Sequence, residues 1–234
     1  MSFPNHWLSS YVGLKSINLV AKLEFPPTTI KHVNTVKTAG TCYGVSWTDD
    51  DRIFCAQDGQ VEVRHATDLR LDKTLNIPGG QHVFSSELSG KKLFTKIGSI
   101  KDERYVTYCG TTERPRQRVL HSQESEDKIK ITHMSANKDY IASIDFVNKT
   151  LKVFSSTTEE HLFDIQLTDF QLLYGVHLTA DGVLVTDMDG GKLCKYALTP
   201  SPDTIWTCTG LPHAGGITTD ESGFIYVASG RQPL

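Results

Sequence analysis

Asp145 and Asp187 each end an apolar run at a turn, and carboxylates placed in this way are candidate calcium ligands. A calcium ion held by such side chains could activate water for hydrolysis. The comparable positions of two related segments hold Gln57 and Ser229, so the acidic set is incomplete for a hard cation. The chain also lacks G-x-S-x-G, H-E-x-x-H and P-loop motifs. We therefore predict that the protein is not an enzyme, with a calcium-dependent hydrolase as the alternative.

Two histidines, His133 and His177, follow apolar positions of similar register, as Ser46 and Thr218 do. Strand alternation would point these four side chains into a central channel. Two neutral imidazoles could hold a transition metal, but no carboxylate accompanies them in matching register. A polar, water-filled channel is the simpler interpretation, and we expect neither a metal nor another cofactor.

Arginine residues cluster in the stretch TTERPRQRV and just before it. These residues are Arg104, Arg114, Arg116 and Arg118, with Tyr105 and Tyr108 nearby. Such a group could bind a nucleic-acid backbone and stack bases. A solvated turn around Pro115 explains the same residues, and the net charge of −3 favours that interpretation.

The composition is typical of a folded protein, and the cysteine pattern indicates a reducing compartment. The 234 residues are 38% hydrophobic and 22% charged, enough for one sizeable core. The five cysteines are scattered and show no C-x-x-C spacing, so we expect no disulfide framework and a cytoplasmic location. No apolar run approaches the ~20 residues that a bilayer helix needs, and the start does not resemble a signal peptide, so we expect no membrane partner.

Short β-branched runs separated by Gly, Asp, Asn and Ser turns predict an all-β protein. The stretch 174–198 and the stretch 43–66 both open with Tyr-Gly-Val and continue through a turn, an apolar run, an Asp-Gly turn and an alternating run. A four-strand unit that recurs every ~40–45 residues is typical of a β-propeller blade. An unrelated β-sandwich is the alternative.

We therefore predict one propeller domain over residues 1–234, built from five four-stranded antiparallel blades. The expected blades span 43–78, 79–125, 128–168 and 173–210, and the last joins 213–230 to 14–38. The last repeat lacks its outer two strands, and the segments 14–25 and 29–38 would supply them, which closes the ring and removes exposed edges. The alternative is a fragment of a six-bladed propeller.

The best-preserved repeats carry the pattern Gly-Ile-x-x-Asp-x-x-Gly-x-Ile-Tyr-Val-Ala. It comprises Gly216, Ile217, Asp220, Gly223, Ile225, Tyr226, Val227 and Ala228, and is matched by Gly175, Val176, Asp181, Gly182, Leu184, Val185 and Asp187. This pattern resembles the NHL-type propeller repeat found in the C-terminal domain of tripartite-motif proteins. The resemblance implies a scaffold that binds protein or RNA on one face of the disc.

In a propeller, the connections between blades share one face with the turns between second and third strands. On this loop face we expect Tyr43, His82, Tyr174, His213 and Arg231, together with Asp145 and Asp187. Tyr, His and Arg combine contact area with hydrogen bonding and suit a binding rim. Alternatively, Tyr43 and Tyr174 only pack where strands enter the disc. We expect a non-enzymatic scaffold for a protein or peptide, with a lectin-like carbohydrate binder or an RNA binder as alternatives.

Overall fold

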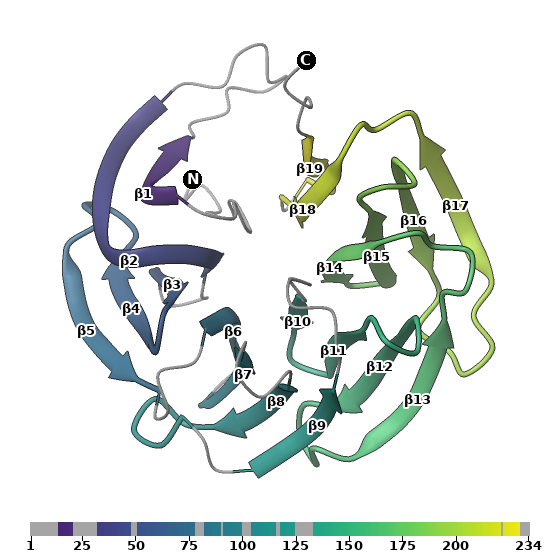
Figure 1. The fold of residues 1–234 in the computed structure, drawn as a ribbon, viewed down its shortest axis with the longest axis horizontal. Coiled ribbons are helices and arrows are strands. Elements are labelled where there is room, and N and C mark those ends of the chain that lie inside the picture. The colour runs from purple at the N-terminus through teal and green to yellow at the C-terminus, as the bar shows by residue number, and fades with distance from the viewer. Residues whose placement is uncertain are drawn as a thin grey trace.

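The computed structural model describes residues 14–20, 32–47, 51–77, 82–89, 91–99, 104–115, 118–124, 133–220 and 222–229. These residues form small antiparallel sheets arranged around a ring (Figure 1). No helix long and apolar enough to cross a membrane occurs in this part of the chain. The predicted all-β propeller arrangement is confirmed.

In the second, third and fourth sheets the strands follow one another from the centre of the ring outward (Figure 1). The first sheet contains β1 (Leu14–Val20), β2 (His32–Trp47), β3 (Arg52–Gln57), β4 (Gln60–His65) and β5 (Leu71–Asn76). The second contains β6 (His82–Ser89), β7 (Lys92–Ser99), β8 (Arg104–Gly110) and β9 (Arg118–Glu124). The third contains β10 (Met134–Ala136), β11 (Tyr140–Asp145), β12 (Thr150–Ser155) and β13 (His161–Gln166). The fourth contains β14 (Leu173–Thr179), β15 (Gly182–Asp187), β16 (Lys192–Tyr196) and β17 (Thr204–Thr209), and the last contains β18 (Ala214–Thr219) and β19 (Ile225–Ser229).

The blade count and the ring closure differ from expectation. The described residues form four blades of four strands, with β1 added to the first, and the last sheet has only two strands. We expected β1 and the first part of β2 to complete that last sheet. They do pair with each other, so that Ser16 lies opposite Lys37, but no described strand pairs with the outer edge of β19. Because β2 runs unbroken for 16 residues, the pair is continuous with the first blade. The first part of β2 pairs with β1 and its last part, from Cys42, pairs with β3.

The second strand of the fourth blade shows why blades must pack on each other. All six residues of β15 are buried. Val183 and Val185 join a cluster between the third and fourth blades, whereas Leu184 joins a cluster with Ile217 of β18. Because successive side chains of a strand point to opposite faces, this strand needs a partner on each side.

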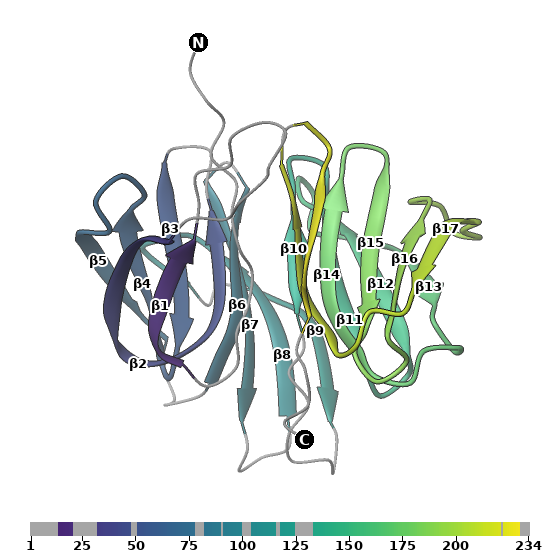
Figure 2. The same ribbon diagram turned by 90° about the horizontal axis from the view of Figure 1, so that it is seen from above.

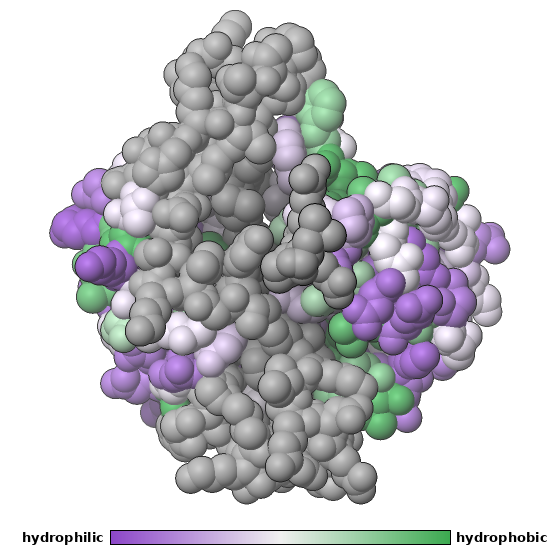
Figure 3. Space-filling model, turned by 45° about the horizontal axis from the view of Figure 1, so that its top comes forward, coloured by the Kyte–Doolittle hydropathy of each residue, from purple (hydrophilic) through white to green (hydrophobic). Residues whose placement is uncertain are grey.

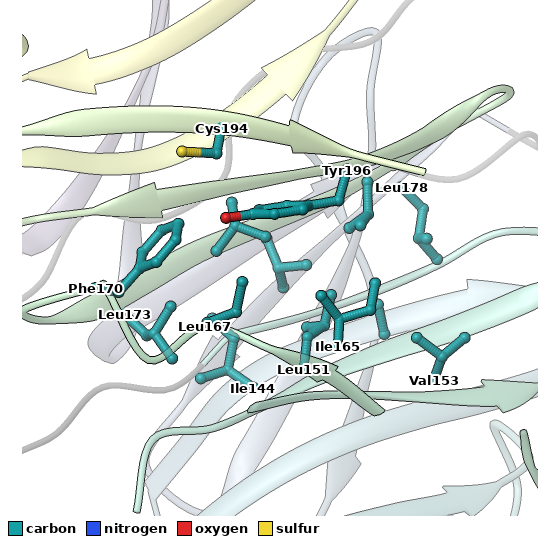
Figure 4. Close-up of a cluster of buried hydrophobic side chains, with 14 of the residues drawn as sticks. Ile144, Leu151, Val153, Ile165, Leu167, Phe170, Leu173, Leu178, Cys194 and Tyr196 are labelled. Carbon is teal, nitrogen blue, oxygen red and sulfur yellow. The ribbon is translucent and has the colours of Figure 1, made fainter. Parts of the chain in front are cut away.

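The largest apolar cluster fills the space between the third and fourth blades (Figure 4). Ile144, Leu151 and Ile165 of the third blade face Val183 and Val185 of the fourth. All five side chains are fully buried. Each such side chain contributes roughly 1.5–3 kcal/mol through its burial, so this interface fixes the two blades relative to each other.

Each complete blade also has a register shift between its third and fourth strands. The shifts fall between Val63 and Arg64, Thr107 and Tyr108, Val153 and Phe154, and Lys195 and Tyr196. The bulged strands lie at the perimeter of the ring, as Figure 1 and the view from above in Figure 2 show. A bulge bends and twists a strand, which makes its open edge a poor template for pairing with another chain.

Candidate functional site

Three side chains at the ends of second strands accept hydrogen bonds on one face. They belong to Gln57, Asp145 and Asp187, which end β3, β11 and β15, and all three residues are fully buried. This face is the one on which the sequence placed the binding residues. What these side chains bind therefore determines what the face can do.

The Asp187 carboxylate accepts three backbone hydrogen bonds. Gln171 N and Leu172 N donate at 2.8 Å each, and Gly190 N donates at 3.0 Å. Glycine is required at 190 because an added Cβ would lie 2.2 Å from Asp187 Oδ2. One carboxylate thus joins the connection that enters β14 to the turn that follows β15.

Asp145 and Gln57 also accept hydrogen bonds within their own blades. Asp145 Oδ1 accepts from Asn148 N at 3.1 Å, and Oδ2 accepts from Asn148 Nδ2 at 3.0 Å. Gln57 Oε1 accepts from Gly40 N at 2.9 Å. Asp145 therefore stabilises the turn that follows β11, whereas Gln57 joins the end of β3 to β2.

These contacts correct the expectation for Asp145 and Asp187. Their carboxylates are buried and directed at the protein's own N–H groups, so they do not form part of an exposed binding rim. Within the described ranges, no group of three or more His, Cys, Asp or Glu side chains could hold a metal ion.

Aromatic residues near the inner strands converge from different blades. Tyr43 of β2 packs against the cluster of the third and fourth blades. Burial, followed by a hydrogen bond to Asp58, raises the pKa of Tyr43 to about 12, so its hydroxyl remains protonated. Tyr174 of β14 is buried and its ring centroid lies 4.9 Å from that of His133. Tyr174 therefore packs where the chain enters the disc, as the alternative interpretation of the sequence proposed, whereas Tyr43 is only partly buried.

Two histidines expected in a polar channel have different environments. His177 Nε2 lies 3.0 Å from Thr219 Oγ1 of the neighbouring sheet. His133 is buried, and its Nε2 has no hydrogen-bond partner among the residues that the structure describes. Burial, followed by the nearby charge of Lys96, lowers the pKa of His133 to about 4, so its ring is neutral at physiological pH.

The remaining residues of the expected loop face are placed only in part. His213 precedes β18, is partly exposed and has a positive φ of 51°. His82 is the first residue of β6, but its side chain lies outside the described part of the structure, and so does Arg231 entirely. These three residues stay a prediction.

The structure describes two arginines of the basic stretch in full. Arg114 is exposed in the turn after β8, and its backbone N donates to Thr111 O at 3.1 Å. Arg118 Nη1 lies 3.3 Å from Glu159, which also binds Lys92 at 2.7 Å. Arg116 and the side chain of Arg104 lie outside the described residues. Glu159 offsets part of the positive charge that the nucleic-acid hypothesis requires.

The sequence analysis missed a buried lysine between the second and third blades. Lys96 of β7 is fully buried, and its Nζ donates to Ser143 Oγ at 3.0 Å and to the Ile144 carbonyl. Ser143 Oγ lies 3.0 Å from Thr107 Oγ1. The available signal was alternation, because Lys96 shares a strand face with Phe94, which is also buried.

Burial lowers the pKa of Lys96 to about 7, although the charge of Asp145 acts in the opposite direction. Burial therefore favours the neutral amine. A neutral amine is a nucleophile and a base, whereas the ordinary ammonium of an exposed lysine is neither.

Comparison with known proteins supports the fold and nothing finer. No protein-family model matches the chain, so the resemblance to the NHL repeat has no support there, and no curated protein matches it. A protein of unknown function from Bacteroides caccae is 14% identical, with a TM-score of 0.65 over 97% of this chain and 83% of that one. A proposed 6-phosphogluconolactonase from Bacteroides fragilis is 11% identical, with a TM-score of 0.59 over 92% of this chain and 70% of that one.

Replacing Asp187 by alanine should destabilise the fold. Three backbone N–H groups lose their acceptor, which costs roughly 2–3 kcal/mol in the free energy of unfolding. The matched control is Asp189→Ala, two residues away and exposed, which should change this free energy by less than about 0.5 kcal/mol. Denaturant unfolding measures both, and equal effects would contradict the assigned role.

Acid should destabilise the protein partly through Asp145. Burial raises the pKa of its carboxyl, but hydrogen bonds from His121 and Asn148 outweigh burial and hold that pKa well below its usual range. The resulting stabilisation is complete above the unfolded pKa of about 3.9 and is lost as the pH falls through lower values.

Thermal melting between neutral pH and pH 3 tests this expectation. Asp145→Asn should show a flatter loss of Tm than the wild type below about pH 4. The exposed Asp139→Asn should keep the wild-type slope. An unchanged slope in Asp145→Asn would show that other carboxyls account for the acid sensitivity.

Proposed function

We propose that this propeller is a non-enzymatic binding module whose loop face engages a protein or peptide. The observation that carries the proposal is the fixing of the loops by buried acceptors, of which Asp187 alone binds three backbone groups. Loops that are rigid before binding lose little entropy when a partner arrives. The partner would meet Tyr43, His213 and the segments around His82 and Arg231.

The carboxylates of Asp145 and Asp187 act in this proposal by holding the loops. The contact residues are then aromatic or cationic, which is the composition of many interface centres. An RNA partner would depend on Arg114 and Arg118, and a carbohydrate partner would require pockets that recur between blades. Both are outcomes that the binding experiment below can reveal.

A second candidate is a lactone hydrolase. The likeness to the proposed 6-phosphogluconolactonase favours it. At 11% identity the likeness extends to the fold alone. Hydrolysis of 6-phosphogluconolactone by the wild type would favour this candidate, and no hydrolysis would reject it.

We also propose that the ring closes as the sequence suggested, with five blades. β1 and the first part of β2 form a hairpin beyond the four strands of the first blade, whereas β18 and β19 lack two strands. Both hairpins border the same opening of the ring (Figure 1). Pairing β1 with the free edge of β19 would give every blade four strands.

Binding should depend on Tyr43 far more than on an exposed aromatic residue at the opposite end of the disc. Tyr43→Ala should weaken affinity by about thirtyfold, as expected for a residue worth roughly 2 kcal/mol at an interface centre. Phe224→Ala, in the turn between β18 and β19 and 41% exposed, should leave it unchanged.

The immobilised chain is first used to recover binding proteins from cell lysate. The affinity of each recovered protein for the wild type and for both variants is then measured by calorimetric titration. Circular dichroism melts verify that both variants fold. Affinity that falls in Phe224→Ala and not in Tyr43→Ala would refute the loop face. Salt-dependent binding that is lost in Arg114→Glu and Arg118→Glu would indicate RNA instead.

Removal of residues 1–31 tests the closure. If β1 covers the edge of β19, amide hydrogen exchange in Ile225–Ser229 should accelerate several-fold on deletion, because the edge groups lose their partners. Deletion of residues 1–13 retains β1 and is the matched control. Unchanged exchange in β19 after the longer deletion, with exchange altered only in β2, would show that β1 belongs to the first blade alone.

A further inference from the structure

The outer strand of each complete blade has one edge with which no described strand pairs. These strands are β5, β9, β13 and β17, and they end their sheets at the perimeter of the ring (Figure 1). An unpaired edge presents backbone N–H and C=O groups that can bind another strand, and proteins commonly protect it with charged side chains. The four edges differ in this protection.

Three of the four outer strands carry charged residues. β5 contains Asp72 and Lys73, β9 contains Arg118, and β13 contains Asp164. The sequence of β17 is TIWTCT, which has no charged residue, no proline and no glycine. Six-residue segments of high β-propensity and low charge are the ones that pair most readily with other chains. β17 is therefore the least protected of these edges.

The bulge of β17 affects only the start of the strand. Its register shift falls at Lys195 and Tyr196 of β16, and from Trp206 to Thr209 the two strands pair regularly. In the other three blades a bulge and charged side chains act together, whereas β17 has the bulge alone. Four residues of β17 thus remain straight enough to accept a further strand.

β17 is also accessible and lies beside compensated charges. Five of its six residues are exposed, and Ile205 is 49% exposed. Both lysines of the adjacent β16 are paired, because Lys192 Nζ lies 2.7 Å from Asp169 Oδ2 and Lys195 Nζ lies 2.7 Å from Asp181 Oδ2. Two such edges can therefore approach each other without strong electrostatic repulsion.

The chemistry of β17 suits a second copy of itself. Antiparallel pairing is favoured over parallel pairing, and about a two-fold axis the alternation of side chains allows two central registers. One places Trp206 opposite its own copy and Ile205 opposite Thr207. The other places Thr207 opposite its own copy and Ile205 opposite Thr209. Aromatic, β-branched and Thr–Thr pairs are the cross-strand pairs that stabilise sheets.

We propose that the protein forms a two-fold symmetric dimer in which β17 pairs antiparallel with β17 of a second copy. The fourth blades of the two rings would then form one continuous sheet. The two copies would use the same surface, as the commonest homodimers do. The interface is small, so association should be weak and reversible. The dimer goes beyond loop-face binding and does not depend on it.

Antiparallel pairing would also set the orientation of the two rings. β17 ends at the loop face, where Leu211 N donates to Gly191 O at 3.0 Å. Because the second β17 runs in the opposite direction, the second ring would be turned over. The two loop faces would point to opposite sides of the dimer. If the loop face binds a partner as proposed above, one dimer could therefore join two partner molecules.

Sedimentation equilibrium of the full chain tests the dimer. The average mass of the wild type should rise from that of a monomer towards that of a dimer as the concentration increases from micromolar to millimolar. Thr207→Lys should weaken association by at least about tenfold, because two like charges would meet near the axis. The matched control is Thr74→Lys, at the corresponding exposed position of β5, which should associate like the wild type.

Opposite charges and hydrogen exchange locate the contact. Thr207→Asp should also associate weakly alone, but an equal mixture of Thr207→Asp and Thr207→Lys should associate more tightly than either variant. In the wild type, amide exchange in Thr204–Thr209 should slow as the concentration rises, whereas exchange in Leu71–Asn76 should not change. Circular dichroism melts verify that the variants fold.

Several results would overturn the proposal. One is a wild type that stays monomeric at millimolar concentration, and another is equal association of the wild type and folded Thr207→Lys. Protection that appears only outside β17 would assign the dimer to another surface. If the Thr207 variants do not fold, exchange in the wild type decides, because slower exchange in β17 supports the pairing and unchanged exchange rejects it.

Discussion

Burial of both faces of every blade is the constraint on which this structure depends. A blade such as β14–β17 is apolar on each side, with Val183 and Val185 on one face and Leu184 on the other. A single blade would leave one of these faces in water, at a cost of roughly 25 cal/mol per Å² of apolar surface. Stability is therefore a property of neighbouring pairs, and repetition of the unit follows from it.

Blade packing leaves the ends of the strands to be organised by other means. Loops lack ladder hydrogen bonds, so the chain supplies side-chain acceptors at the ends of second strands. Such an acceptor lies inside the disc and holds backbone on both sides of it, as Asp187 does with Leu172 and Gly190. The face can then present Tyr43 from β2 and His213 from the turn before β18 on backbone that is already ordered. In the view of Figure 3, the described surface is a mosaic of polar and apolar residues.

The sequence was sufficient to predict the features that follow from repetition and from strand alternation. The period and the hairpin at 174–198 followed from local turn chemistry, because Asp and Gly at 189–191 leave the chain few other conformations. It did not predict that β2 continues through Cys42, since no local signal marks which neighbour each half of a long strand will choose. The role of Asp187 was missed for a related reason, because its partners Gln171 and Leu172 precede it by a whole hairpin.

The interface between the second and third blades departs from this apolar pattern, because it contains the fully buried Lys96. Replacing a buried, unpaired amine by a well-packed apolar side chain is often neutral or stabilising, so packing gives no reason for Lys96. The interface beside it, built from Ile144, Leu151 and Ile165, shows that this chain can join blades with apolar residues alone. Lys96 Nζ donates to Ser143 Oγ and to the Ile144 carbonyl, so these hydrogen bonds join the second blade to the third. The second blade therefore carries a chemical group that the architecture of the ring does not require.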